Sequence, residues 1–151
     1  MAVTVRDPNT IHLGGEIVLV GDEAAVEAIT PGALVDLAAT GYENHGTAGG
    51  LAQPAFALEQ AEMNAGQNQT PHVLTIDDPY AIGDLMKVGV GSPGSTFYAL
   101  LASGQNVAKG AELDSAGDGT LTAGTTAPPV RAIEAVDNSA GDANRIRVEV
   151  I

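Results

Sequence analysis

The stretch Arg145-Ile146-Arg147-Val148-Glu149-Val150-Ile151 alternates charged and apolar residues more regularly than any other part of the chain. Successive side chains of a strand point to opposite faces, so Ile146, Val148 and Val150 would share one face. This period of two predicts a half-buried β-strand.

Shorter segments of similar character lie upstream, at residues 17–20, 72–76, 85–90 and 96–101, and turn-forming residues separate them. Segments 85–90 and 96–101 flank Ser92-Pro93-Gly94 and are expected to form a hairpin. We therefore expect a mainly β fold with a compact body, either β-barrel-like or a β-sandwich.

The chain also contains an internal repeat. Ile29–Asp36 reads ITPGALVD and Val107–Asp114 reads VAKGAELD, and each is followed by a Gly-Thr pair and a strand-like segment that ends in Glu. We expect a single β-rich domain over 25–151 with an internal duplication, 25–64 and 80–151. The two copies share mostly turn residues, so chance similarity is the alternative.

Two short segments have helical character. Asp22–Ala28 would form about two turns with Asp22 as N-cap. Ala57–Met63 is the second candidate, although the repeat places its first residues on a strand. We therefore expect one or two short helices beside the strands.

Composition limits the kind of core. Aromatic residues make up 3% and Trp is absent, so the core must consist of Ala, Val, Leu and Ile. The 19 Gly and 8 Pro argue against a helical bundle. No apolar run approaches the ~20 residues of a membrane-spanning helix, and the first residues do not resemble a signal peptide.

The charge excludes several partners. With 19 acidic and 6 basic residues the net charge is −13, which opposes binding to nucleic acid or to an anionic membrane. Cysteine is absent, so the chain has no disulfide, thiolate metal site or cysteine nucleophile. Such an acidic, Lys-poor composition is typical of proteins that work in high salt, and it also suits a surface that must stay soluble at high local concentration.

Two glycine-rich motifs have weak matches to known sites. Gly89-Val90-Gly91-Ser92-Pro93-Gly94 matches a dinucleotide-binding pattern with Asp114 downstream, but a strand-like segment follows where that site needs a helix. Residues 114–119 resemble part of a Ca²⁺ loop, but Thr125 stands at the position of the bidentate Glu. We interpret both as turns between strands.

No other constellation predicts chemistry. His12, His45 and His72 are far apart and lack a second metal ligand at helical or hairpin spacing. A Gly-x-Ser-x-Gly nucleophile motif is absent, and Asp77-Asp78 fits the cap of a turn. We expect no catalytic residue, no metal and no cofactor, and thus a binding or structural module rather than an enzyme.

Several segments carry a resemblance to a known family: residues 80–84, 98–110, 117–121, 132–137 and 145–150, with 45–50 and 55–59. Over roughly residues 25–151 the chain resembles head-decoration (capsid cement) proteins of tailed double-stranded DNA viruses. The resemblance implies a structural virion protein, made in the host cytoplasm, that forms a homotrimer on the capsid exterior and clamps adjacent major capsid proteins. The Asn/Gln-rich segment 64–70 and the strong negative charge depart from the pattern.

The alternative function is a small-ligand- or carbohydrate-binding β-barrel module. Such sites usually need aromatic platforms, and the aromatic residues other than histidine are limited to Phe56, Phe97, Tyr42, Tyr80 and Tyr98. The two functions differ in oligomeric state, since a trimer favours a cement protein.

The N-terminal residues suggest an anchor. Residues 1–24 are expected to form an extended arm, up to about Leu13, and a first strand. Val3-Thr4-Val5 is strand-prone, and Asp7-Pro8-Asn9 interrupts regular structure. We expect Val3, Val5 and Arg6 to contact the capsid by adding a strand to a neighbouring sheet. The alternative is an ordinary first strand of the protein's own sheet.

Overall fold

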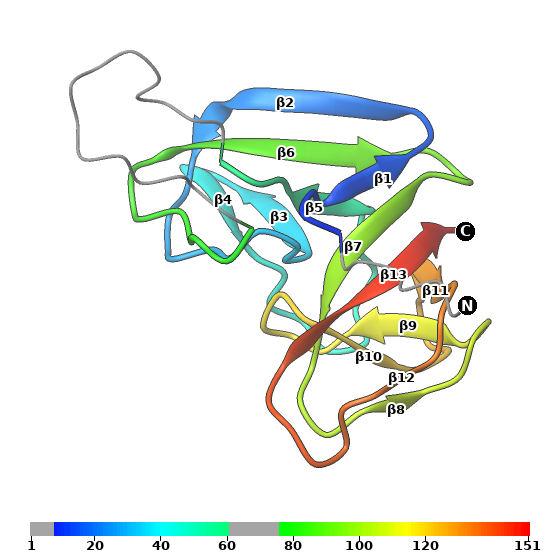
Figure 1. Cartoon of the computed structure of the whole chain (residues 1–151). Helices are drawn as coiled ribbons and strands as arrows, with labels where there is room; N and C mark the ends of the chain where they lie inside the picture. Colours follow the sequence, from blue (N-terminus) through cyan, green and yellow to red (C-terminus); the bar gives the residue numbers. More distant parts are fainter. Residues whose placement is uncertain (1–7, 61–75) are drawn as a thin grey trace.

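The computed structural model describes residues 8–60 and 76–151, and these contain strands, turns and loops but no helix. The mainly β prediction is therefore confirmed (Figure 1). The strands in chain order are β1 (His12–Gly14), β2 (Ile17–Ala24), β3 (Val35–Ala38), β4 (Gly41–Asn44), β5 (Ala55–Ala57), β6 (Leu85–Gly91), β7 (Thr96–Leu101), β8 (Asn106–Val107), β9 (Glu112–Ser115), β10 (Leu121–Ala123), β11 (Val130–Ala132), β12 (Val136–Asp137) and β13 (Asn144–Val150).

Five strands of the second half close into a barrel. Their order is β7-β10-β9-β11-β13, and β13 pairs back onto β7 from Asn144↔Leu101 to Glu149↔Thr96. The predicted alternation of the last strand is confirmed, since Ile146, Val148 and Val150 are all buried. Closing the sheet leaves no free edge along these strands.

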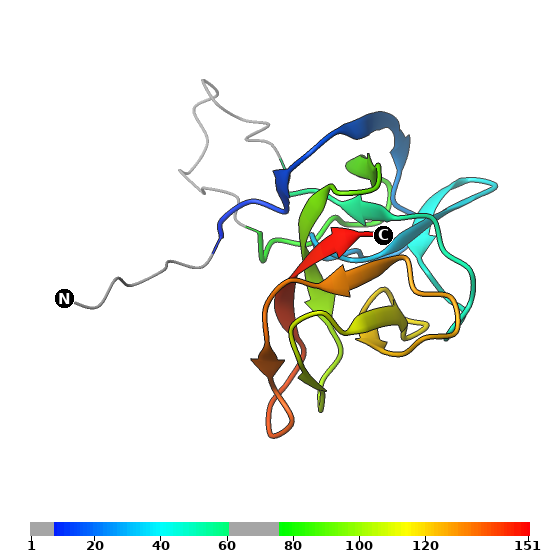
Figure 2. The same cartoon turned by 90° about the vertical axis from the view of Figure 1, so that its right-hand side faces the viewer.

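The strands of the first half have the same order of neighbours, β2-β4-β3-β5-β6. The ladders β2–β6, β5–β6 and β3–β4 supply three of the joins. Isolated bridges supply the other two, Leu34↔Phe56 and Ala25↔Tyr42. In Figures 1 and 2 this first set, coloured blue to green, lies above the second set.

Backbone hydrogen bonds match between the two sets. Gly32 N–H donates to Ala57 C=O at 2.7 Å, and Gly110 N–H donates to Ala132 C=O at 2.8 Å. Three more pairs of bonds correspond, written donor to acceptor: Ala57 to Ala33 with Ala132 to Ala111, Leu58 to Lys87 with Ile133 to Arg147, and Val26 to Tyr42 with Ala102 to Leu121. The matched strands run from β2 to β6 and from β7 to β13, so their limits differ from the expected 25–64 and 80–151.

Each set has its own apolar core. Ala55 and Ala57 pack with Ile29, Met86 and Val88 in the first set. The other core consists mainly of the second set and also takes in first-set residues, Leu34, Phe56 and Leu58 among them. On β5, Ala55 and Ala57 therefore pack into one core and Phe56, on the opposite face, packs into the other. This strand holds the two sets together.

The helix predictions are wrong where the structure describes them. Asp22, Glu23 and Ala24 belong to β2. Asp22 lies at an irregularity in the register, Glu23 and Ala24 continue the pairing with β6, and Ala25 bridges Tyr42. A helix of seven residues is marginal without tertiary support, so strand pairing overrides the local preference. In Ala57–Met63, Ala57 ends β5 and residues 58–60 form no regular element, while 61–63 lie outside the described residues.

The predicted hairpin is also wrong in its pairing. The turn at Pro93-Gly94 is present, but β6 pairs with β2 and β5, whereas β7 pairs with β1, β10 and β13. The turn therefore joins the two sets of strands. Because each flanking strand has partners in its own set, neither is free to pair with the other.

The expected arm does not extend as far as Leu13. Ile11 is fully buried, its N–H donates to Glu59 Oε2 at 2.8 Å, and its carbonyl accepts the Tyr98 N–H at 2.7 Å. β1 then pairs with β7. This part of the chain thus belongs to the body, while residues 1–7 and most of the predicted strand 72–76 lie outside the described residues.

Candidate functional site

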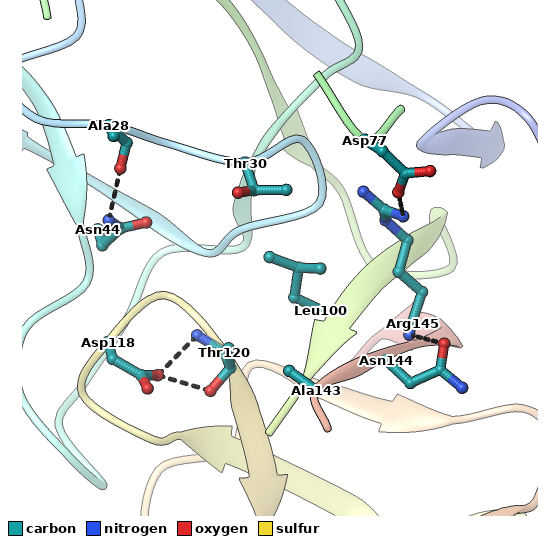
Figure 3. Close-up of a pocket in the computed structure, with 10 residues that line it drawn as sticks. All are labelled: Ala28, Thr30, Asn44, Asp77, Leu100, Asp118, Thr120, Ala143, Asn144 and Arg145. Atoms are coloured by element: carbon teal, nitrogen blue, oxygen red, sulfur yellow. Dashed lines mark hydrogen bonds and ion pairs between the residues drawn. The ribbon is translucent and has the colours of Figure 1, made fainter. Parts of the chain in front are cut away.

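A polar cleft of about 460 Å³ lies where the two sets of strands meet. Ala28, Thr30, Asn44 and, from the β5–β6 connection, Asp77 come from the first set, and Leu100, Asp118, Thr120, Ala143, Asn144 and Arg145 come from the second (Figure 3). Its size falls within the range of small-molecule sites.

Arg145 forms one wall of the cleft and is already engaged. Its Nη1 lies 2.7 Å from Asp77 Oδ1, and its Nη2 donates to the carbonyls of Pro31, at 3.1 Å, and Ile76. The Arg145 side chain is only 10% exposed, whereas that of Asp77 is 80% exposed. Arg145 on β13 therefore holds Pro31 and residues 76–77 in place through these bonds. Its guanidinium group is not free to bind an anion.

Asn44, Asp118 and Thr120 also bond to their neighbours. Glu27 Oε1 accepts the Asn44 N–H at 2.8 Å and Asn44 Nδ2 at 3.0 Å. Asp118 Oδ1 accepts both the N–H and the hydroxyl of Thr120, at 3.1 and 2.5 Å. The carboxylates of Asp77 and Asp118 and the hydroxyl of Thr120 are thus already engaged, and no aromatic ring is among the lining residues.

A second, less polar cavity of about 370 Å³ lies beside the start of β6. Tyr80 lines it and donates its hydroxyl to the Leu58 carbonyl at 2.7 Å, while the Lys87 N–H donates to the hydroxyl oxygen at 3.3 Å. Burial raises the pKa of Tyr80, with smaller contributions from the negative charges of Glu59 and Asp84. Tyr80 thus acts as a neutral linker between β5 and β6.

The structure brings together one pair that the sequence analysis did not foresee. His45 Nδ1 lies 2.7 Å from Ser115 Oγ, and Nε2 lies 3.2 Å from the Leu51 carbonyl. Both side chains are buried. The pair thus ties the loop after β4 to β9, and a substrate could not reach the serine. A separation of 70 residues left no local signal for it.

The glycine motif serves packing. A Cβ on Gly91 would lie 2.7 Å from the Phe97 ring, and one on Gly89 would lie 3.4 Å from it. The Phe97 ring itself stacks on Phe56 at 4.7 Å between centroids. Gly89 and Gly91 lie within β6 and make room for an aromatic pair. Only the end of the motif, at Pro93-Gly94, is a turn, and it joins two strands that do not pair with each other.

Asp114 has a structural role. It is buried, and its two carboxylate oxygens accept the N–H groups of Thr126 and Ala127, each at 2.9 Å. A carboxylate that accepts two backbone N–H groups holds a loop in place. Residues 8–60 and 76–151 contain no cluster of His, Asp or Glu suited to a metal ion.

Large apolar side chains are exposed at several places. They are Val18, Leu19, Leu37, Leu51, Ile82, Leu85 and Ile151. Val18 and Leu19 are adjacent on β2, so both faces of that strand expose an apolar side chain. Val3, Val5 and Arg6, the expected capsid contacts, lie outside the described residues.

Neither the protein-family models nor the curated proteins include a match to this chain. Within the part of the chain that the structure describes, no helix could cross a membrane.

Proposed function

We propose that this chain is a structural virion protein that decorates the outside of a tailed-virus capsid and clamps adjacent major capsid proteins. The observation that carries the proposal is the resemblance of residues 80–84, 98–110, 117–121 and 145–150 to capsid cement proteins. These residues belong to the framework of the body. Gly104 and Gly110, for example, adopt φ values of 75° and 89° that favour glycine.

The physical properties of the body suit this role. A cement protein needs strand edges and apolar side chains that can contact neighbouring subunits. β2 lies at the edge of its sheet, and Val18, Leu19 and Leu85 expose apolar side chains on β2 and β6. It also needs a face that stays soluble at high local concentration, which the net charge of −13 provides. Repetition over a lattice makes weak single contacts sufficient through avidity.

The direct test uses capsid shells stripped of the protein. Added protein should bind saturably to expanded shells and raise the temperature at which they break. A variant with lysine at the exposed Leu85 would report whether the apolar β6 end takes part. Shells that bind no protein at any concentration would contradict the proposal.

Homotrimerisation is part of the same proposal. Light scattering at micromolar concentration in molar salt should give three times the chain mass. A stable monomer would restrict assembly to the capsid surface.

The polar cleft favours a second candidate, a small-ligand- or carbohydrate-binding module. Its hydroxyl, amide and carboxylate groups at Thr120, Asn144 and Asp118 could bond a polyol, although its lining lacks an aromatic platform. Titration with a panel of sugars, followed by the amide signals of these residues, would test this. Saturable shifts that disappear in Asn144→Ala, from a monomeric protein, would favour the module over the cement protein.

A further inference from the structure

β2 has an open edge at the top of the molecule (Figure 1). Along Ile17–Ala24 it pairs with β6, and the bridge from Ala25 to Tyr42 begins only past its end. Within residues 8–60 and 76–151 no strand pairs with the other side of β2.

The second set of strands shows what covers this position. Ala57 and Ala132 are matched residues, and they pair with Val88 and Val148, so Val88 and Val148 are equivalent. Val20 pairs with Val88 and Phe97 pairs with Val148, which makes Val20 equivalent to Phe97 and Leu19 equivalent to Thr96. In the second set β1 lies on this edge, with His12 opposite Phe97 and Gly14 opposite Thr96. The fold therefore accommodates an added antiparallel strand there, and the described residues supply one only to β7.

The composition of the β2 edge is that of a strand acceptor. Its centre is apolar, with Val18 64% and Leu19 60% exposed. Soluble proteins protect long edge strands with lysine, proline or a covering segment, and Ile17–Val20 contains neither lysine nor proline. Glu16, Asp22 and Glu23 flank this apolar centre.

We propose that residues Val3–Arg6 of a second copy of this chain add as a strand to the β2 edge. Val3 and Val5 share one face of such a strand and supply β-branched side chains for either Val18 or Leu19, whichever lies on that face of the sheet, and Arg6 supplies a positive charge for the acidic flanks. Residues 1–7 span ~23 Å when extended, which is nearly the length of β2. The acceptor is thus this protein itself, whereas the sequence analysis expected a sheet of the coat protein.

Other occupants of the edge fit less well. Symmetric pairing of two β2 strands about Leu19 and Val20 would set Glu16 opposite Glu23, and like charges opposite each other are destabilising. The N-terminal segment of the same chain is a poorer occupant of the β2 edge, because the dark blue trace before β1, to which it is attached, runs away from β2 in Figures 1 and 2.

The contact joins two different surfaces, a donor segment and an acceptor edge. Such head-to-tail contacts form a closed ring when the rotation between successive copies closes, and an open filament when it does not. A ring of three is the homotrimer of the proposed function, and this inference rests on that function only for the number of copies. The pairing itself requires no capsid.

The absence of cysteine allows a direct test. Val5→Cys is mixed with either Val18→Cys or Leu19→Cys, which cover the two faces of β2, and the mixture is oxidised in molar salt. We expect a disulfide-linked pair of chains from one of these mixtures. Leu37→Cys is the matched control, because Leu37 is 59% exposed on β3, and it should give no such product.

Two further variants test the energetics. Deletion of residues 2–7, which removes no described residue, and Leu19→Lys, which repels Arg6, should each lower the mass measured by light scattering, whereas Leu37→Lys should not. An unchanged mass for both variants, or a cross-link found only within single chains of a Val5→Cys/Leu19→Cys double variant, would overturn the inference. If the deletion variant keeps its mass but no longer binds shells, the segment binds the coat protein, and only the proposed function survives.

Discussion

At the scale of single residues, the position of Arg145 shows how one side chain joins distant segments. Its guanidinium bonds to the carbonyls of Pro31 and Ile76 and to the carboxylate of Asp77. Both carbonyl bonds are partly buried. A partly buried carbonyl that loses its donor costs more free energy of folding than an exposed ion pair contributes. The stabilising contribution therefore comes from the carbonyl bonds, since Asp77 is well solvated.

Arg145→Ala should lower the free energy of unfolding by about 1–3 kcal/mol, because two backbone acceptors lose their donor. Arg131→Ala is the matched control, since Arg131 forms a 2.6 Å ion pair with Glu149 but its side chain is 53% exposed. That variant should cost less than about 1 kcal/mol. Denaturant titration measures both, and equal losses would contradict the argument.

Tyr80 predicts an alkaline limit to stability. Because burial raises its pKa above 10.0, the folded chain holds the phenolic proton more tightly than the unfolded chain. This contribution is fully present below pH about 10 and is lost as the pH rises through the folded pKa. Tyr80→Phe should therefore lose stability at neutral pH, through the missing bond to Leu58, and fall less steeply above pH about 10. Denaturant midpoints over this range test it, and parallel profiles would refute it.

At the scale of elements, the matched turns of the two sets allow a comparison within one chain. Gly32 and Gly110 adopt φ values of 93° and 89° and donate equivalent hydrogen bonds. Their surroundings differ, because a Cβ on Gly32 would lie 2.9 Å from the Tyr98 carbonyl oxygen, while a Cβ on Gly110 meets nothing within 4 Å. The first turn is covered by the second set of strands, and the second turn is open.

Gly110→Ala should cost about 1–2 kcal/mol, the strain of an L-residue in this conformation. Gly32→Ala should cost clearly more, because the backbone of β7 must also move. Thermal unfolding of the two variants side by side measures the difference. If Gly110→Ala proved equally damaging, the φ strain alone would account for both.

At the scale of the whole molecule, net charge opposes the compact state. Thirteen excess negative charges repel one another in a body of 151 residues. Among residues 8–60 and 76–151, Arg131, Arg145 and Arg147 each form an ion pair with an acidic side chain, while the whole chain carries 19 acids and 6 bases. Stability should therefore depend on the surrounding salt.

The melting temperature should rise between low and molar NaCl, because the screening length shortens from about 10 Å at 0.1 M to about 3 Å at 1 M. An equal molarity of sucrose controls for solute effects other than screening and should raise the melting temperature less. Calorimetry at constant protein concentration makes the comparison. A flat or falling melting temperature in NaCl would show that charge repulsion is not limiting.

Much of the fold follows from local sequence. The alternation of residues 145–151 and the apolar run 17–20 predicted β13 and the start of β2, because one-sided burial imposes a period of two. Residues 29–36 and 107–114 contain the same turn and strand signals, and their glycines adopt the same conformation. The polar cleft and the His45–Ser115 pair had no such signal, since their members come from distant segments.

What the sequence by itself determined is the strand character of the segments, the positions of the glycine turns and the acidity of the surface, because each depends on neighbouring residues or on composition alone. Only the tertiary structure decided which strands pair. β6 and β7 flank one turn yet belong to different sets, and Asp22–Ala24 extend β2 despite their helical character. Pairing brings together residues far apart in the chain, and burial and backbone hydrogen bonds over whole strands outweigh the small preferences of single residues.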